Sequence, residues 1–206
     1  MRALIKKLYF IFLKIVAPVV FETAGTSAPV TFRGLFVQKV LRINGSAYWP
    51  VHYTSKINGV SRIKIGVGTA PGLSPGCYIQ GIGHILIGDY TLVGPNVGII
   101  SANHDPMDPS KHIKSQVKIG SYCWLGMGSI VLPGVELGNH TVVAAGSVVT
   151  KSFDHGYCVI GGNPAFVIKY LVKEDCVRYE NKYKYYGFVP AKKFESYCKK
   201  KLMVEL

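Results

Sequence analysis

The feature that most constrains the fold of this chain is a six-residue period of aliphatic side chains in its middle part. Steps of six from Ile87 meet only Val, Ile or Leu, and after an interruption the same frame resumes at Ile119. The positions are Ile87, Val93, Ile99, Ile119, Leu125, Val131, Leu137, Val143 and Val149. In a chain that is 49% hydrophobic, such a run arises by chance about once in 600 trials per frame.

A period of six excludes a long α-helix, which repeats every ~3.6 residues, and a simple alternating strand. It predicts an all-β solenoid in which three hexapeptides build one triangular coil. One aliphatic side chain per hexapeptide then points into the prism and stacks on its equivalents in neighbouring coils. The position after each aliphatic residue is usually small, which lets the chain turn a corner without a Cβ clash. These small residues are Gly88, Gly94, Gly120, Gly126, Gly138 and Ala144.

The repeat divides the chain into three parts. We predict the solenoid over residues 57–170, with a loop at about 105–116 where a segment with two prolines disfavours regular strand. Residues 1–56 are predicted to form an amphipathic helix and a lead-in that caps the first coil. Residues 171–206 are predicted to form a basic helical extension, for which a cap on the solenoid and a surface for membrane headgroups both remain open.

Charge is concentrated on the flanks of the predicted solenoid. Residues 1–60 hold eight Lys or Arg against one acid, and residues 172–206 hold nine against five. Residues 61–171 are nearly balanced, with seven basic and five acidic side chains. Basic flanks suit a negatively charged partner such as an anionic membrane surface or a phosphate group. The chain carries no recognisable nucleic-acid-binding module, so we do not expect it to bind nucleic acid.

An ordered set of short motifs carries a family resemblance and covers roughly residues 57–170. The motifs are Ile87-Gly88-Asp89, Gly94-Pro95-Asn96-Val97, Ser101-Ala102-Asn103-His104-Asp105, Ile119 to Gly126, Leu132-Pro133-Gly134-Val135, Ala145 to Lys151, and Gly161-Gly162-Asn163-Pro164-Ala165. On these residues the chain resembles the hexapeptide-repeat acyltransferases, particularly sugar O-acetyltransferases of the galactoside and maltose type. It looks closest to acetyltransferases of bacterial surface-polysaccharide gene clusters.

The resemblance implies a left-handed parallel β-helix with N-terminal and C-terminal helical extensions. It also implies a homotrimer with three active sites in the clefts between neighbouring prisms. Acetyl-CoA would be the acyl donor and a sugar or glycan hydroxyl the acceptor, and no metal would be needed. We therefore expect a cytoplasmic enzyme that transfers the acetyl group directly, without an acyl-enzyme intermediate.

His104 matches the catalytic base of the resembled family. A neutral imidazole within hydrogen-bond reach can take the proton of a sugar hydroxyl as its oxygen attacks the thioester carbonyl. The alternative for His104 is a turn histidine bonded to backbone. Asp105 follows directly, and orienting the imidazole or capping the turn are equally open. Asn103, Gln80 and His84 are the candidate acceptor-binding residues.

The same resemblance predicts the residues that hold acetyl-CoA. Trp124 would line the cleft, or pack between subunits, or both. A backbone amide beside the cofactor, that of Gly126, would stabilise the oxyanion. Lys151 would bind a phosphate, with a solvated surface lysine as the alternative. The full set of predicted cofactor-binding residues is Trp124, Gly126, Met127, Ala145, Gly146, Thr150, Lys151 and Lys169.

The amino-terminal residues 1–21 are apolar but interrupted by Lys6, Lys7 and Lys14, so no uncharged run there is long enough to span a bilayer. A helix lying on the inner face of the membrane and a helix packed on the protein or a sister subunit both remain open. A cleaved signal peptide is disfavoured because the chemistry needs a cytosolic cofactor. Five cysteines without a CxxC pair favour reduced thiols.

Three other functions compete with this assignment. A γ-type carbonic anhydrase shares the solenoid but needs two zinc-binding histidines five residues apart, and no histidine lies five residues from His104. The acceptor could instead be the amine of an amino sugar, serine or an antibiotic hydroxyl, which nothing in the sequence excludes. A non-catalytic, membrane-associated scaffold is disfavoured by the joint presence of His104, Trp124 and Lys151.

Overall fold

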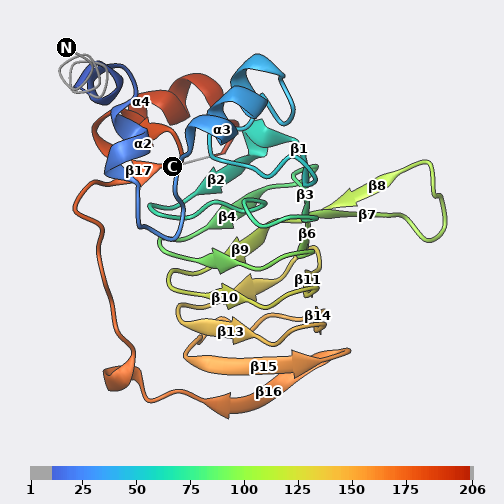
Figure 1. Cartoon of the computed structure of the whole chain (residues 1–206). Helices are drawn as coiled ribbons and strands as arrows, with labels where there is room; N and C mark the ends of the chain where they lie inside the picture. The colour runs from blue at the N-terminus through green and yellow to red at the C-terminus, as the bar shows by residue number, and fades with distance from the viewer. Residues whose placement is uncertain (1–10, 205–206) are drawn as a thin grey trace.

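The body of the molecule is a stack of short parallel strands arranged as three sheets. Figure 1 shows it as a computed structural model that describes residues 11–204, so the first ten residues of the predicted amino-terminal helix lie outside the described part. Sheet A consists of β1 (Lys56–Asn58), β3 (Tyr78–Gln80), β6 (Gly98–Ile100), β11 (Ile130–Val131) and β14 (Val148–Val149). Sheet B consists of β2 (Ile63–Ile65), β4 (Ile85–Ile87), β9 (Val117–Ile119) and β12 (Glu136–Leu137). Sheet C consists of β5 (Leu92–Val93), β10 (Trp124–Leu125), β13 (Thr141–Val143), β15 (Cys158–Gly162) and β16 (Ala165–Tyr170).

The chain visits the three sheets in rotation, from sheet B to sheet C to sheet A, so each circuit is one coil of a solenoid. The strand registers place equivalent aliphatic residues directly over one another, as in the column Ile99, Val131 and Val149. Eight of the nine periodic residues are at most 4% exposed, and Val93 is partly buried. The predicted inward stacking of the hexapeptide positions is therefore confirmed.

Small residues at the corners are required because successive coils approach closely there. A Cβ atom on Gly138 would lie 2.2 Å from the carbonyl oxygen of Asp154 in the next coil, and one on Gly120 would lie 2.6 Å from the amide nitrogen of Asn139. No side chain fits in such a space without moving the backbone. This is the physical reason for the glycines that follow the periodic aliphatic residues.

The corner between sheets B and C carries a column of four stacked rings that the sequence pattern did not indicate. Tyr90, Tyr122, His140 and Tyr157 occupy equivalent positions with φ between 47° and 58°. Adjacent ring centroids are 5.0–5.3 Å apart. Left-handed backbone is unfavourable for these residue types, and ring stacking is one compensation for it. His140 is 7% exposed, and this burial lowers its pKa below the ordinary value.

A two-stranded hairpin projects from the corner between sheets A and B (Figure 1). Strand β7 (Ala102–His104) pairs in antiparallel fashion with β8 (His112–Lys114), and the chain then enters sheet B at β9. The predicted loop at about 105–116 is therefore partly strand, with the proline-containing turn at its tip. Regular pairing resumes at His112 because the prolines end before it.

The amino-terminal flank covers the first coil. It contains a helical segment at 11–16, helix α2 (Pro18–Glu22), helix α3 (Phe32–Leu35) and the π-helix η1 (Phe36–Val40), followed after β1 by the 3-10 helix η2 (Val60–Arg62). Trp49 is fully buried, and its ring nitrogen donates to the carbonyl of Pro71. Across the described residues, no helix has both the length and the apolar character to cross a bilayer.

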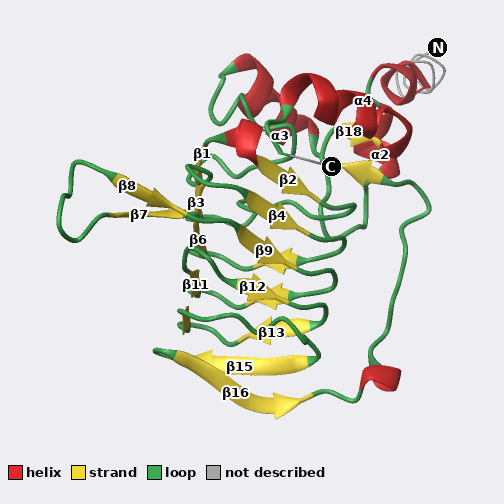
Figure 2. Cartoon of the chain, turned by 180° about the vertical axis from the view of Figure 1, so that it is seen from behind, coloured by secondary structure: helices red, strands yellow, loops and turns green. Residues whose placement is uncertain are grey.

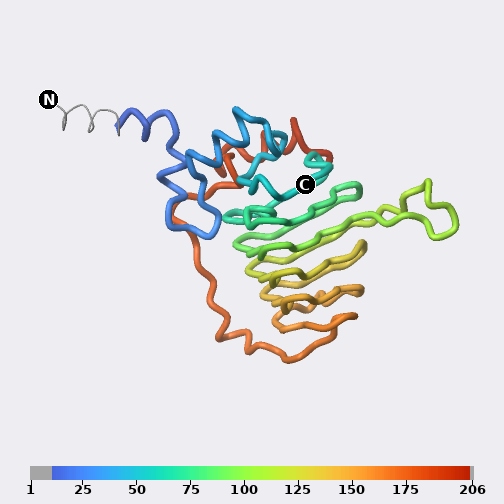
Figure 3. The backbone as a smooth tube through the Cα atoms, turned by 45° about the vertical axis from the view of Figure 1, so that its right-hand side comes forward, coloured from blue at the N-terminus to red at the C-terminus, as the bar shows by residue number. Residues whose placement is uncertain are grey.

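The carboxy-terminal flank returns to the same end of the molecule (Figure 2). After β16, which reverses direction against β15, residues 171–184 form a strap that runs back along the outside of the coils (Figure 3) and includes the 3-10 helix η3 (Lys173–Asp175). The strap leads to the hairpin β17 (Tyr185–Tyr186) and β18 (Val189–Pro190) and to helix α4 (Ala191–Lys201). Phe194 and Cys198 of α4 are buried, and the ring of Phe194 lies 6.0 Å from that of Tyr48.

The strap is attached to the ring column by hydrogen bonds. The hydroxyl of Tyr122 donates to the carbonyl of Tyr179 at 3.0 Å, and the amide of Asn181 donates to the hydroxyl of Tyr90 at 3.0 Å. The guanidinium of Arg178 donates to the hydroxyl of Tyr157 at 2.8 Å. The ring column therefore fixes the path by which the carboxy-terminal helix reaches the first coil.

Candidate active site

His104 lies at the outer end of β7, with its side chain exposed to solvent. Its Nδ1 is 2.7 Å from the carbonyl oxygen of Pro109 across the hairpin tip. Because a carbonyl oxygen can only accept, Nδ1 carries the proton in this hydrogen bond. In the neutral ring, Nε2 is then unprotonated and has a free lone pair, as a general base requires.

The ring of His112 lies against that of His104, with the centroids 4.3 Å apart and the planes tilted by 40°. The two residues are directly opposite in the hairpin register, so both side chains leave the same face of the hairpin. The sequence pattern alone does not predict a role for His112. The alternation of strand residues on either side of a tight turn is the signal that pairs it with His104.

Asp105 and Asn103 flank the histidine without contacting its ring. The carboxylate of Asp105 accepts from the amide of Met107 at 2.8 Å, which is the turn-capping role of the two that were open. The His104 imidazole is oriented by the Pro109 carbonyl instead. Asn103 lies on the opposite face of β7 and is exposed, and its side chain makes no hydrogen bond to another described residue.

Gln80 and His84 lie at the root of the hairpin. The side-chain oxygen of Gln80 accepts from the amide of Ala102 at 3.1 Å, and its carbonyl accepts from the hydroxyl of Ser101 at 2.5 Å. Gln80 therefore braces the strand that carries His104. His84 lines a small cavity beside the root, and its Nδ1 is buried without a hydrogen-bond partner among the described residues.

Trp124 begins β10 on sheet C and is 54% exposed. It lies between Leu92 of the preceding coil and Val142 of the following coil, so an apolar strip runs along sheet C beside it. A cavity of about 190 Å³ adjoins the indole and is also lined by Leu92, Ser74 and Ser27.

The turn after Trp124 stacks on the equivalent turn of the next coil. The amide of Gly126 donates to the carbonyl of Val143 at 2.8 Å, and the amide of Gly146 donates to the carbonyl of Met127 at 2.8 Å. The Gly126 amide is therefore already engaged in the coil ladder, which contradicts its predicted role as oxyanion donor. The amides of Met127 and Ala145 donate no hydrogen bond to any described residue.

The remaining predicted cofactor residues lie further along the stack and are exposed. Thr150 and Lys151 follow β14 on sheet A, and the ammonium of Lys151 lies 5.8 Å from the ring centroid of Phe153. Lys169 lies in β16, opposite Val159 of β15. These residues are spread over different edges of the solenoid, because Met127 lies between sheets C and A, Lys151 follows a strand of sheet A, and Lys169 lies in sheet C.

The predicted base and the cofactor turn at Met127 occupy different corners of one chain, although Thr150 and Lys151 follow sheet A at the same corner as the hairpin. The hairpin with His104 leaves the corner between sheets A and B, whereas the turn at Met127 lies at the corner between sheets C and A. The strands of sheet A separate these corners by about 10 Å. No contact among the described residues joins the two groups, so the structure of one chain does not bring Trp124 to His104.

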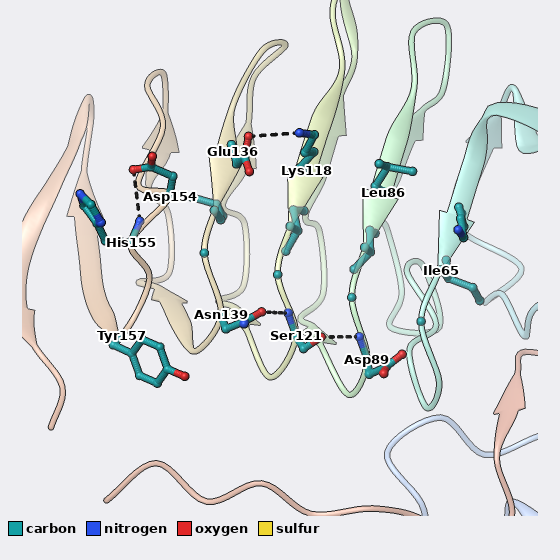
Figure 4. A pocket seen from close by; sticks show the side chains of 18 of the residues that line it. Ile65, Leu86, Asp89, Lys118, Ser121, Glu136, Asn139, Asp154, His155 and Tyr157 are labelled. Atoms are coloured by element: carbon teal, nitrogen blue, oxygen red, sulfur yellow. Dashed lines mark hydrogen bonds and ion pairs between the residues drawn. The ribbon is translucent and has the colours of Figure 1, made fainter. Parts of the chain in front are cut away.

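A groove of about 630 Å³ lies on the outer face of sheet B, where Figure 4 shows Leu86, Lys118 and Glu136 along the strands. None of the predicted site residues lines it. Lys118 and Glu136 form an ion pair at 3.4 Å across it. Within residues 11–204, no group of three or more His, Cys, Asp or Glu side chains is arranged to hold a metal ion.

Comparison with known proteins identifies relatives of the repeat region. Residues 116–151 match the family model described as bacterial transferase hexapeptide (six repeats). The galactoside O-acetyltransferase of Lactococcus lactis is 36% identical over 102 residues, which cover 47% of this chain and 48% of that protein. The chain thus spans about half the length of the curated relatives it matches.

Two solved structures share the architecture. A maltose O-acetyltransferase from Clostridium difficile 630 superposes with a TM-score of 0.58 and 28% identity, covering 69% of this chain and 80% of that one. A galactoside acetyltransferase in complex with coenzyme A superposes with a TM-score of 0.53 and 26% identity, covering 68% and 70%. The family prediction made from the motifs is therefore confirmed, and the chain is a relative of the hexapeptide-repeat acetyltransferases.

Proposed function

We propose that this protein is an O-acetyltransferase that moves the acetyl group of acetyl-CoA to a hydroxyl of a sugar or surface-polysaccharide precursor. The observation that carries the proposal is the 2.7 Å contact between Nδ1 of His104 and the Pro109 carbonyl oxygen, which in the neutral ring leaves Nε2 free to act as a base. The similarity to sugar O-acetyltransferases supports the donor and the acceptor class. We also infer that the coils are left-handed, as the resemblance implies.

The reaction proceeds by direct transfer in a ternary complex. Nε2 of His104 takes the proton of the acceptor hydroxyl as the oxygen forms a bond to the thioester carbonyl carbon. Collapse of the tetrahedral intermediate breaks the carbon–sulfur bond, and the protonated imidazole returns the proton to the thiolate. A positioned base contributes about 10²–10⁴-fold to such a rate.

The oxyanion of the intermediate needs a donor that is not already bonded. We assign this role to the amide of Met127, on the turn that follows Trp124, or to that of Ala145, on the equivalent turn of the next coil, because neither amide donates to a described residue. Preorganised backbone donors of this kind stabilise a developing negative charge at little reorganisation cost. Acetyl-CoA supplies the activated acetyl group, the exposed turns at Met127 and Gly146 would hold its arm, and Lys151 would bind a phosphate.

The active site is proposed to form between two chains of a homotrimer. Within one chain His104 and Trp124 occupy different corners of the prism, so the base of one subunit would face the cofactor turn of its neighbour. Sheets A and C present the exposed or partly exposed apolar side chains that such contacts need. Those side chains include Ile100, Ile130, Val148, Leu92 and Val142.

The base assignment is tested by acetyl-CoA cleavage with a panel of sugar and amino-sugar acceptors. His104→Ala is expected to lower kcat by about 10²–10⁴-fold while the KM for acetyl-CoA stays within about threefold. His155→Ala removes another exposed histidine and serves as the matched control. Unchanged turnover in His104→Ala would refute the assignment.

The shared site is tested by mixing two inactive variants. His104→Ala and Trp124→Ala chains are unfolded together and reassembled, so that some clefts pair an intact histidine with an intact tryptophan from a neighbour. Random assembly restores about a quarter of the wild-type activity if each site draws on two chains. No restoration above the separate variants would show that each chain builds its own site.

The amino-terminal flank is proposed to contact the inner face of the membrane from the cytoplasm. Exposed apolar side chains gather there beside cations, and the segment from 11 to 56 has a single acid, Glu22. This pattern is typical of a surface that binds anionic lipid. The exposed apolar residues are Ile11, Phe12, Ile15, Val16, Phe32, Phe36, Val40, Leu41 and Ile43.

Vesicle co-sedimentation tests this contact. Full-length protein is expected to bind vesicles with an anionic phospholipid more tightly than zwitterionic vesicles, and to lose that preference at high salt. Replacing Phe12 and Ile15 with Ser is expected to abolish binding, because both side chains are more than half exposed. Equal binding of both vesicle types by the wild type would refute it.

A further inference from the structure

A cavity of about 270 Å³ lies at the root of the hairpin that carries His104. Arg62, His84 and Lys114 line it, together with uncharged residues, and no carboxylate does so. The side chains of Arg62 and Lys114 form no hydrogen bond or ion pair with any described residue. Three basic groups therefore surround one hollow without a counter-charge from the part of the chain that the structure describes.

The local backbone explains why these groups meet. A Cβ atom on Gly83 would lie 2.5 Å from the carbonyl oxygens of both Ser101 and Ser115, so only glycine allows this turn to approach both ends of the hairpin. The next residue, His84, is thereby brought beside Lys114, the last residue of β8. Arg62 ends the 3-10 helix of the coil before it.

The cavity is coupled to the candidate base by the hairpin register. Lys114 lies opposite Ala102, and His112 lies opposite His104, so these side chains leave the same face of the hairpin. Two residues along a strand correspond to about 7 Å. A single sugar ring spans a comparable distance, so an anionic group in the cavity and a hydroxyl at His104 can belong to one monosaccharide unit.

On the basis of the proposed function, we infer that the acceptor is a phosphorylated sugar whose phosphate binds between Arg62, His84 and Lys114. Guanidinium and ammonium groups are the preferred protein partners of phosphate oxygens. Nδ1 of His84 is buried and has no hydrogen-bond partner among the described residues, so it is available to a ligand in the cavity. Phosphate binding fixes the sugar so that its hydroxyl reaches Nε2 of His104.

The inference is tested by comparing neutral hexoses with the same hexoses as 1-phosphates. The kcat/KM for the phosphorylated acceptor is expected to be at least about tenfold higher. Arg62→Gln and Lys114→Gln are each expected to remove most of that preference, with the KM for acetyl-CoA unchanged. Lys111→Gln is the matched control, because Lys111 lies in the same hairpin, pairs with Asp108 and does not line the cavity.

A binding measurement separates this inference from the proposed function. Inorganic phosphate is titrated into the full chain by calorimetry, which needs no turnover. Loss of binding in the Arg62→Gln/Lys114→Gln double variant supports the pocket, whereas equal binding in the double variant, or none in the wild type, overturns it. Failure to acetylate any acceptor would instead refute the proposed function. The phosphate titration would still test the pocket, because it needs no turnover.

Three acceptors assayed in parallel distinguish which kind of phosphorylated sugar binds in the cavity. They are a hexose 1-phosphate, a nucleoside diphosphate hexose, and a polyprenyl diphosphate hexose in detergent micelles. Each of the three supports the inference if its transfer depends on Arg62 and Lys114. Equal transfer to the neutral hexose would overturn it.

Discussion

Replacing Gln80 with Leu tests whether this residue binds the acceptor or braces the hairpin. Its side-chain oxygen accepts from the amide of Ala102, a residue that is only 2% exposed. Leucine has a similar volume but no acceptor, so the amide is left buried and unpaired. Such a loss costs about 1–3 kcal/mol. For a chain of this size, each kcal/mol corresponds to about 2–4 °C in Tm, so a decrease of about 2–12 °C is expected.

The catalytic consequence follows from the position of Ala102, two residues before His104 on the same strand. Loosening the root of the hairpin displaces the imidazole, and a displacement of ~1 Å at a catalytic group can cost about 10²-fold in rate. We therefore expect Gln80→Leu to lower kcat by up to about 10²-fold while the KM for the acceptor changes little. Thiol release from acetyl-CoA and thermal unfolding measured on the same preparation give both numbers.

The matched control is Gln80→Glu, which keeps an oxygen that can accept from the Ala102 amide. It is expected to retain most of the Tm and most of kcat. An unchanged Tm in Gln80→Leu together with a raised KM for the acceptor would refute the bracing role. Gln80 would then be an acceptor-binding residue, as the resemblance suggested.

Three further predictions concern the coils and their ring column. Burial lowers the pKa of His140, so the stability that its neutral ring contributes is complete above the unfolded-state pKa of about 6.5 and is lost as pH falls through the folded-state value. His140→Tyr is expected to weaken the decrease of the free energy of unfolding at acid pH. An unchanged decrease would contradict this. Gly138→Ala places a Cβ 2.2 Å from the carbonyl oxygen of Asp154 and is expected to lower the free energy of unfolding in urea by ~1–3 kcal/mol. Gly128→Ala has open space around the Cβ, so it tests the strain of left-handed backbone alone. Tyr122→Phe removes the hydrogen bond to the Tyr179 carbonyl and is expected to cost about 0.5–1.5 kcal/mol and to speed proteolysis within residues 171–184; an unchanged cleavage rate would show that this bond does not hold the strap.

The ordered motifs along the chain were enough to predict the family, whereas the contacts around the candidate site could not be predicted from them. The Gly126 amide was not a good prediction for the oxyanion donor, because its engagement with Val143 depends on which residue of the next coil lies above it. The turn-capping role of Asp105 and the ring contact of His112 likewise depend on the closure of the hairpin.

What the sequence by itself determined is the solenoid. Its six-residue period specifies which side chains point inward, and that information is local, because each hexapeptide repeats the same choice of one aliphatic and one small residue. The tertiary structure alone decided how the corners are filled and where the flanks go. The column from Tyr90 to Tyr157 has no periodic hydrophobic signal, since its members are a mixture of tyrosine and histidine spaced by coils of unequal length. The strap follows that column because its hydrogen bonds join residues far apart in the chain, such as Tyr90 and Asn181, and pairings at such separations leave no pattern in a single sequence.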